Sequence, residues 1–322
     1  MYLAPGQPPR PRLPHGVYAA RRTIAGILIV AVLFLVYSVV TAVFAGPSSP
    51  TQAAPTAPST SLVVSGGPAA SPTPPTPSST SPSTSSTELK PKEKSVPTAA
   101  NPAVVYVAGD SDAGTFAPYL DKLMKQTGMV ITTLDYKVSS GLARPDFFDW
   151  PSYFAQRIPA VNPDIVVVTF GGNDAQGLRN ADKSWAVQHA PASGGDDADW
   201  KAEYGKRVGA AMDYLGGDNR SLIWVGIPND DNADNTARLQ VQNEVVMDEA
   251  SKRPKVVFVD TWKRFSGLSG GFASDVQDPR DGVFKPVRRA DGFHLNTTGA
   301  EILALDIAEA IRTELRARGG AL

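Results

Sequence analysis

The sequence predicts an α/β fold for the part of the chain that follows about residue 100. Two observations indicate it. Five short runs are rich in β-branched residues, as buried strands are, and amphipathic stretches of helical periodicity separate them. Strands that alternate with helices form a parallel sheet that is covered on both faces.

The expected strands are residues 104–108, 129–134, 165–170, 222–227 and 256–259. The expected helices are residues 116–126, 200–215, 237–252 and 300–316. We therefore expect a single domain over residues 101–322, a flavodoxin-like three-layer α/β/α arrangement around a five-stranded parallel sheet.

The N-terminal region has the features of a membrane anchor. Residues 1–22 carry four arginines and no acid, and residues 23–45 form an uncharged apolar run, long enough for the roughly 20 residues that span a bilayer. No charge follows until Glu88, so the positive-inside rule predicts a single-pass cell-membrane protein with residues 1–22 in the cytoplasm and the globular domain outside. The alternative is a cleaved secretory signal with Val43 and Ala45 at the peptidase site, but the apolar run exceeds the usual length of about 7 to 15 residues.

A linker is expected between the transmembrane helix and the domain. Residues 46–100 consist mainly of Pro, Ser, Thr and Ala, with too few large apolar side chains to form a core. Proline-rich chain extends by roughly 3.1 Å per residue, so the linker can reach on the order of 150 Å. We expect a disordered, passive spacer that lets the domain search the cell envelope.

The composition excludes several classes of site. The chain has no cysteine, which excludes disulfides and thiolate zinc sites. It also has no stripe of Lys and Arg interleaved with aromatic residues, so nucleic acid is not an expected partner. The acidic residues 229–235 lack the central glycine of a calcium loop and have Val241 where its glutamate should fall. We expect neither a metal nor a cofactor.

Small and polar residues follow three of the expected strands. They are residues 109–111, 139–141 and 171–174. In open parallel sheets, sites form at the carboxyl ends of the strands, and packing alone does not require such residues there. We therefore expect the functional site at this edge of the sheet.

These segments contain a candidate nucleophile. Acyl transfer by a serine needs a hydroxyl, a base, a carboxylate that orients the base, and donors that face the developing oxyanion. Ser111 follows a strand and begins an expected helix, so its own N–H group and the positive end of the helix dipole face incoming negative charge.

The base is expected among three histidines. His15 lies on the cytoplasmic side of the predicted membrane helix, and His189 lies in a polar stretch typical of a solvated loop. His294 is the stronger candidate, because Asp291 lies three residues earlier in a tight turn and can orient its imidazole. The residues Thr298 to Glu301 have the pattern of a capping box and predict the start of the next helix.

Four sequence blocks occur in order along the chain: GDS at 109–111, Gly141, GGND at 171–174 and DGFH at 291–294. Together they resemble the four blocks of the SGNH (GDSL-type) hydrolase superfamily, over about residues 103–316. The segment from Ser140 to Trp150 is similar to that of a bacterial membrane-anchored envelope subgroup. A single GDS is weak evidence, whereas four ordered blocks are specific.

The resemblance implies roles for particular residues. Ser111 would be the nucleophile, and Asp291 and His294 would complete a Ser-His-Asp triad. The backbone N–H groups of Ser111 and Gly141 and the side-chain amide of Asn173 would form the oxyanion hole. The chemistry agrees, because an amide is a neutral donor and glycine lets the backbone approach a substrate closely.

Other residues near these blocks each have two readings or depart from the family pattern. Arg144 and Asp174 are candidate substrate contacts, although Arg144 can equally pair with an acid and brace its loop. The chain departs from its relatives at Asp112, where many have Leu, and at Ala175, where the subgroup commonly has Arg. Asp112 either favours the helix N-terminus or repels anionic substrates.

The expected function is an extracytoplasmic serine esterase that hydrolyses O-acyl esters, acetyl or short-chain, of envelope glycans or lipids. One alternative is an O-acyltransferase that moves the acyl group to a sugar hydroxyl with the same residues. Another is a non-catalytic glycan-binding module of this fold. The expected partners are the acylated substrate and, through the N-terminal helix, the membrane; the sequence indicates no protein partner.

Overall fold

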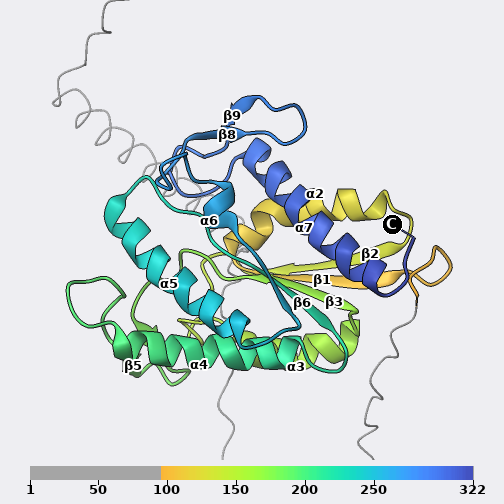
Figure 1. Cartoon of the computed structure of the whole chain (residues 1–322). Helices are drawn as coiled ribbons and strands as arrows, with labels where there is room; N and C mark the ends of the chain where they lie inside the picture. Colours follow the sequence, from red (N-terminus) through yellow and green to blue (C-terminus); the bar gives the residue numbers. More distant parts are fainter. Residues whose placement is uncertain (1–95, 322) are drawn as a thin grey trace, which may run out of the picture. The chain divides into compact units, whose positions relative to one another are not determined.

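The computed structural model describes residues 96–321. A five-stranded, wholly parallel sheet forms the centre of this part of the chain (Figure 1). Its strands lie in the order β2-β1-β3-β6-β7. They are β1 (Ala103–Gly109), β2 (Val130–Tyr136), β3 (Ile165–Thr169), β6 (Ser221–Val225) and β7 (Val256–Val259). The predicted α/β class and the predicted five-stranded parallel sheet are confirmed.

Helices cover both faces of the sheet (Figure 1). The helices α2 (Ser111–Lys125) and α7 (Thr297–Ala317) pack on one face. The other face is covered by α3 (Trp150–Val161), α4 (Ala198–Leu215) and α5 (Ala233–Ser251). Short elements complete the domain: α6 (Thr261–Arg264), the hairpin β4 (Leu178–Arg179) with β5 (Trp185–Val187), and the hairpin β8 (Asp275–Gln277) with β9 (Phe284–Pro286).

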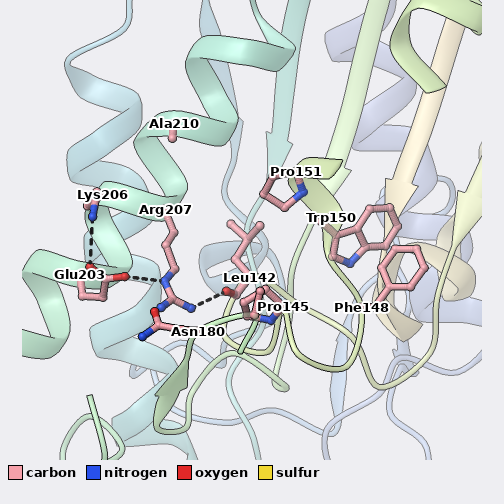
Figure 2. A pocket seen from close by; sticks show the side chains of 12 residues that line it. Leu142, Pro145, Phe148, Trp150, Pro151, Asn180, Glu203, Lys206, Arg207 and Ala210 are labelled. Atoms are coloured by element: carbon pink, nitrogen blue, oxygen red, sulfur yellow. Dashed lines mark hydrogen bonds and ion pairs between the residues drawn. The ribbon is translucent and has the colours of Figure 1, made fainter. Parts of the chain in front are cut away.

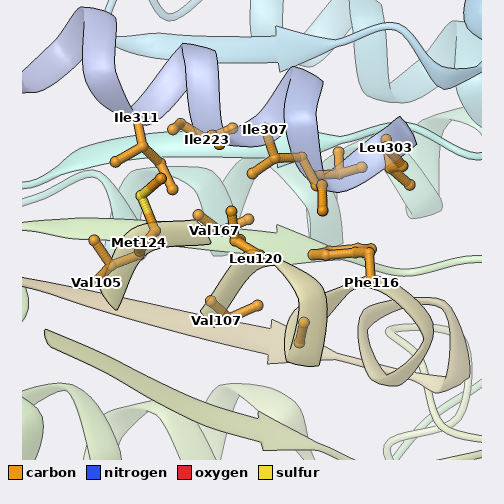
Figure 3. Close-up of a cluster of buried hydrophobic side chains, with 14 of the residues drawn as sticks. Val105, Val107, Phe116, Leu120, Met124, Val167, Ile223, Leu303, Ile307 and Ile311 are labelled. Atoms are coloured by element: carbon orange, nitrogen blue, oxygen red, sulfur yellow. The ribbon is translucent and has the colours of Figure 1, made fainter. Parts of the chain in front are cut away.

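The alternation of side chains along the strands divides the core in two. Val105 and Val107 of β1 face α2 and α7, where they pack with Leu120 and Ile307 (Figure 3). Tyr106, between them in sequence, belongs to the cluster on the opposite face. Every residue of β3 is buried, which explains why the sequence of this strand is continuously apolar and not alternating.

The face covered by α3, α4 and α5 is rich in aromatic rings. Trp150 packs against Phe154 and Phe170 with ring centroids 5.1 and 5.4 Å apart, and Phe170 packs against Trp224 at 5.8 Å. The sequence did not predict α3, because Pro151 and Pro159 interrupt the helical pattern. Pro151 is tolerated in the first turn, where the missing N–H has no helical acceptor.

The start of α7 corrects one prediction. The helix begins at Thr297, and its cap is Asn296, whose side chain accepts a hydrogen bond from Gly299 N–H at 3.0 Å. The capping box from Thr298 to Glu301 is therefore wrong. Glu301 instead pairs with Arg280 at 2.6 Å, and Asn is itself among the strongest N-cap residues.

The predicted cytoplasmic segment (residues 1–22), the predicted transmembrane helix (residues 23–45) and the predicted linker up to residue 95 lie outside the described residues. Over residues 96–321, no helix combines the length and the apolar character needed to cross a bilayer.

We predict that Leu120→Ala lowers the free energy of unfolding by about 2 to 5 kcal/mol, because Leu120 is fully buried between α2 and the sheet. Urea unfolding of the full-length protein, followed by tryptophan fluorescence, measures it. The control is Leu268→Ala, at a fully exposed position, which should change stability by less than about 0.5 kcal/mol. Equal effects of the two substitutions would contradict the described packing.

Candidate active site

Ser111 is the first residue of α2 and directly follows β1. Gly109, the last residue of β1, has a φ of +144°, and a side-chain carbon there would overlap the Thr169 carbonyl of the neighbouring strand. Asp110 caps the helix by accepting a hydrogen bond from Asp112 N–H at 3.0 Å. A residue in the first turn of a helix keeps an N–H group without a helical acceptor. Ser111 thus presents both its hydroxyl and an N–H group at the carboxyl edge of the sheet.

Ser111, His294 and Asp291 form a continuous chain of contacts. Ser111 Oγ lies 3.1 Å from His294 Nε2, and His294 Nδ1 lies 3.0 Å from Asp291 Oδ2. The second oxygen of Asp291 accepts from the backbone N–H groups of Phe293 and His294 at 3.0 and 2.9 Å. With Nδ1 donating to Asp291, Nε2 is the nitrogen that accepts from Ser111. Partial burial favours a neutral Asp291, but the His294 N–H groups outweigh it and lower the pKa of this carboxyl.

A half-buried arginine fixes the turn that carries His294. Arg288 donates to the Phe293 carbonyl at 2.9 Å, to Asn229 Oδ1 at 2.8 Å and to the Phe265 carbonyl at 3.1 Å. Burial lowers the pKa of Arg288 to about 10. Nearby carboxylates act to raise this pKa, and Asp230 has the largest effect among them. The guanidinium therefore stays charged near neutral pH. It ties the histidine turn to the loops that follow β6 and α6.

Asp110 orients the amide of Asn173. Its Oδ2 accepts from Gly171 N–H at 2.7 Å and from Asn173 Nδ2 at 3.3 Å. Asp110 is completely buried, which raises its pKa, and the donors on Gly171, Asp112 and Asn173 oppose that rise. Since one amide hydrogen of Asn173 is held by Asp110, the direction of the other is fixed as well.

Asp174 holds the segment that contains Gly141. Its two carboxylate oxygens accept from Leu142 N–H at 2.9 Å and Ala143 N–H at 2.8 Å, and Tyr204 donates to it at 2.8 Å. A side-chain carbon at Gly141 would overlap Asp174 Oδ1, so only glycine fits. The prediction that Asp174 contacts substrate is therefore wrong, because this carboxyl is fully buried and bound on three sides. The N–H of Gly141 donates to no other described residue.

Two supporting residues were not predicted from the sequence. Gln242 on α5 donates to the carbonyls of Phe170 and Gly171 at 2.9 and 3.1 Å and to Tyr204 Oη at 3.2 Å. Tyr204 on α4 is fully buried, as Gln242 nearly is. A polar residue on the apolar face of an amphipathic helix is the signal that identifies such residues. It does not reveal which loop they support.

Asp112 and Ala175, where the chain departs from the family that it resembles, both lie in closely packed surroundings. Asp112 lies against the Gly171-Gly172 turn, where a side-chain carbon on Gly171 would overlap its Oδ2. Burial and the neighbouring Asp110 raise the pKa of Asp112 well above its usual range, whereas the charge of Arg288 lowers it. Ala175 is buried in a small cluster with Ile227 and Leu239, where an arginine side chain would not fit.

The remaining candidates lie as follows. Arg144 makes a two-pronged ion pair with Asp146, at 2.8 and 3.0 Å, as in the loop-bracing alternative. His189 Nε2 lies 3.2 Å from Asp199 and takes no part in the contacts around Ser111. Trp150 is buried in the core and donates to Ser140 Oγ at 2.9 Å.

The site thus combines a contact chain of hydroxyl, imidazole and carboxylate with rigidly held N–H groups. The N-terminus of α2 and the loops that contain Gly141 and Asn173 supply these N–H groups. The buried carboxyl groups of Asp174 and Asp110 hold these two loops. Residues 96–321 contain no cluster of His, Asp and Glu suited to binding a metal ion. This arrangement can transfer a proton from the hydroxyl to the imidazole and stabilise negative charge nearby.

We predict that Asp174 makes stability depend on pH. The ordinary pKa of an aspartate side chain is 3.8, and burial raises that of Asp174 to about 7. The Ala143 N–H group and the Tyr204 hydroxyl oppose this rise. The protonated carboxyl therefore favours folding: its contribution is fully present below about pH 4 and is lost as the pH rises through about 7. The free energy of unfolding of the wild type should exceed that of Asp174→Asn by less at about pH 7.5 than at about pH 4.5.

Urea unfolding at both pH values measures this difference. Asp248→Asn, at an exposed position on α5, controls for the loss of one negative charge. A difference between wild type and Asp174→Asn that stays constant over this range, or grows with pH, would contradict the described environment of Asp174.

Comparison with solved structures finds several distant similarities. A GDSL-like lipase from Bacteroides thetaiotaomicron is 15% identical with a TM-score of 0.45, and the match covers 66% of this chain and 89% of that one. A catalytic mutant of an acetylxylan esterase from Geobacillus stearothermophilus is 14% identical with a TM-score of 0.46, covering 65% and 94%. A lipase from a goat rumen metagenome is 11% identical with a TM-score of 0.44, covering 65% and 97%. Similarity at this level assigns neither a substrate nor catalytic residues.

Among curated proteins, none matches the chain by sequence. A family model described as "Protein of unknown function (DUF459)" matches residues 104–310. The match spans the segment from β1 to α7 and so includes Ser111, Asn173 and His294. Because it covers more than half of the chain, the protein belongs to the DUF459 family.

Proposed function

We propose that this protein is a serine esterase that hydrolyses O-acyl esters with Ser111 as nucleophile. The observation that carries the proposal is the contact chain from Ser111 Oγ through the His294 ring to Asp291, with contacts of 3.1 and 3.0 Å. A serine that serves only as a helix-start residue has no need of an imidazole that is itself oriented by a carboxylate.

In the first half of the reaction, Ser111 Oγ attacks the ester carbonyl carbon while its proton moves to His294 Nε2. Negative charge develops on the carbonyl oxygen, and the N–H groups of Ser111 and Gly141 and the Asn173 amide stabilise it. Asp291 stabilises the imidazolium that forms and stays ionised, because its pKa is lowered. The C–O bond to the alcohol then breaks, and the alcohol leaves with the proton from His294.

In the second half, water replaces the alcohol. His294 takes a proton from the water, which attacks the acyl-serine carbonyl, and the same donors hold the second oxyanion. The bond to Ser111 breaks, the serine recovers its proton from His294, and the carboxylic acid is released. Every residue has then returned to its starting state.

The proposal includes the place of action. The apolar run at residues 23–45 would hold the protein in the cell membrane with residues 1–22 in the cytoplasm, and residues 46–100 would form the spacer. The esterase domain would then work outside the cytoplasm on acetyl or short-chain esters of glycans or lipids in the cell envelope. The basic N-terminal segment and the Pro-, Ser- and Thr-rich linker support this arrangement.

We predict that Ser111→Ala lowers kcat/KM for 4-nitrophenyl acetate by at least about 10⁴-fold, because the nucleophile is lost. Asn173→Ala should lower it by about 100 to 1,000-fold through the loss of one oxyanion donor. Ser269→Ala, at an exposed serine in the loop after α6, is the matched control and should retain wild-type activity.

Labelling by a fluorophosphonate activity probe gives a second measurement. The wild type should be labelled on Ser111, and Ser111→Ala should not be labelled. Equal turnover by wild type and Ser111→Ala, or a folded wild type that neither turns over esters nor reacts with the probe, would overturn the esterase proposal.

A further inference from the structure

A cavity of about 290 Å³ lies beside Gly141 on the side of the sheet covered by α3 and α4 (Figure 2). Its size is at the lower end of the range for small-molecule sites, which suits one ring better than an extended chain. Gly141 is the only one of the three expected oxyanion donors among its lining residues. The cavity thus borders the segment that carries one expected oxyanion donor, whereas Ser111, Asn173 and His294 do not line it.

The cavity has one apolar wall and one polar wall (Figure 2). The apolar wall includes Pro145 and Phe148, from the segment between β2 and α3, and Pro151, in the first turn of α3. Glu203 and Lys206 of α4 belong to the polar wall. An occupant that touches both walls needs an apolar face and a polar edge.

The polar wall is connected directly to the loop of the oxyanion hole. Arg207 donates from Nη1 to the carbonyls of Leu142 and Ala143 at 3.0 and 3.4 Å, and from Nε to Glu203 at 2.8 Å. Asp174 holds the N–H groups of the same two residues from inside the domain. The loop is thus fixed from both sides, and a molecule in the cavity would contact it on the Arg207 side.

We propose that this cavity is the subsite for the sugar ring whose hydroxyl carries the acyl group, an inference that rests on the proposed esterase function. A pyranose ring has an apolar C–H face for Phe148 and the prolines, and a rim of hydroxyls for Glu203, Lys206 and Asn180. A cavity of this volume suits one ring better than a long alkyl chain. The cavity thus favours an acylated glycan over a long-chain lipid.

The test compares two tryptophan substitutions on α4 in the full-length protein. Ala210 lines the cavity and is exposed, so Ala210→Trp should fill it with an indole ring (Figure 2). Ala202 is exposed on the same helix but does not line the cavity, so Ala202→Trp is the matched control. The probes are a panel of mono-O-acetylated methyl glucoside, galactoside and N-acetylglucosaminide, with 4-nitrophenyl acetate as the ester that lacks a sugar.

For the preferred sugar, Ala210→Trp should lower the ratio of kcat/KM for the acetylated sugar to kcat/KM for the aryl ester by about tenfold, mainly through KM. Ala202→Trp should leave the ratio at the wild-type value. Saturation-transfer NMR should detect binding of the same acetylated sugar to Ser111→Ala and lose it in the Ser111→Ala, Ala210→Trp double variant.

Three outcomes would overturn the subsite: an unchanged ratio in Ala210→Trp, a wild type that does not discriminate among the three acetylated sugars, or an effect of Ala210→Trp on acyl-chain preference instead. The last outcome would assign the cavity to the acyl group. A wild type that hydrolyses none of the esters would instead overturn the proposed function, and the NMR experiment would still decide whether the cavity binds a sugar.

Discussion

Two buried carboxylates, Asp110 and Asp174, hold the site together. Each lies at the carboxyl end of a strand of the sheet, and each accepts hydrogen bonds from a loop that follows a different strand. Burying a carboxyl group without partners would cost several kcal/mol, so the N–H and O–H donors around these two groups are a condition for the fold. The same bonds fix the direction of the Asn173 amide and the position of Gly141. Stability and the positions of the donors that we propose for the oxyanion hole thus depend on the same contacts.

The core explains why these loops are held so firmly. The central strands β1 and β3 are buried on both faces, and the aromatic cluster around Trp150 anchors the segment that follows Gly141. Tyr204 and Gln242 project from α4 and α5 into the loops and bring the helical layer into contact with the site. Arg288 holds the turn of His294 by donating to the Phe293 carbonyl. Preorganised donors of this kind stabilise developing charge without reorganisation during the reaction.

The sequence predicted the parallel sheet because strands buried on both faces leave uninterrupted β-branched runs, as in β3. It also predicted residues that the structure brings together, Ser111 with His294 and Asp291, because local motifs mark them. It missed α3, where Pro151 and Pro159 hide the helical pattern. It misjudged Asp174, since whether a carboxyl in a loop is buried depends on another loop, here 31 and 32 residues earlier in the chain. Tyr204 and Gln242 were missed for the same reason: their partners exist only in the folded chain.

The claim that Ser111, Gly141 and Asn173 share one oxyanion hole is tested most directly by a crystal structure of the wild-type protein with phenylboronic acid, which forms a tetrahedral adduct with an activated serine. We expect boron bonded to Ser111 Oγ and one boronate oxygen about 2.7 to 3.1 Å from both backbone nitrogens and from Asn173 Nδ2. An adduct on another residue, or a boronate oxygen that points away from Gly141 and Asn173, would contradict the account.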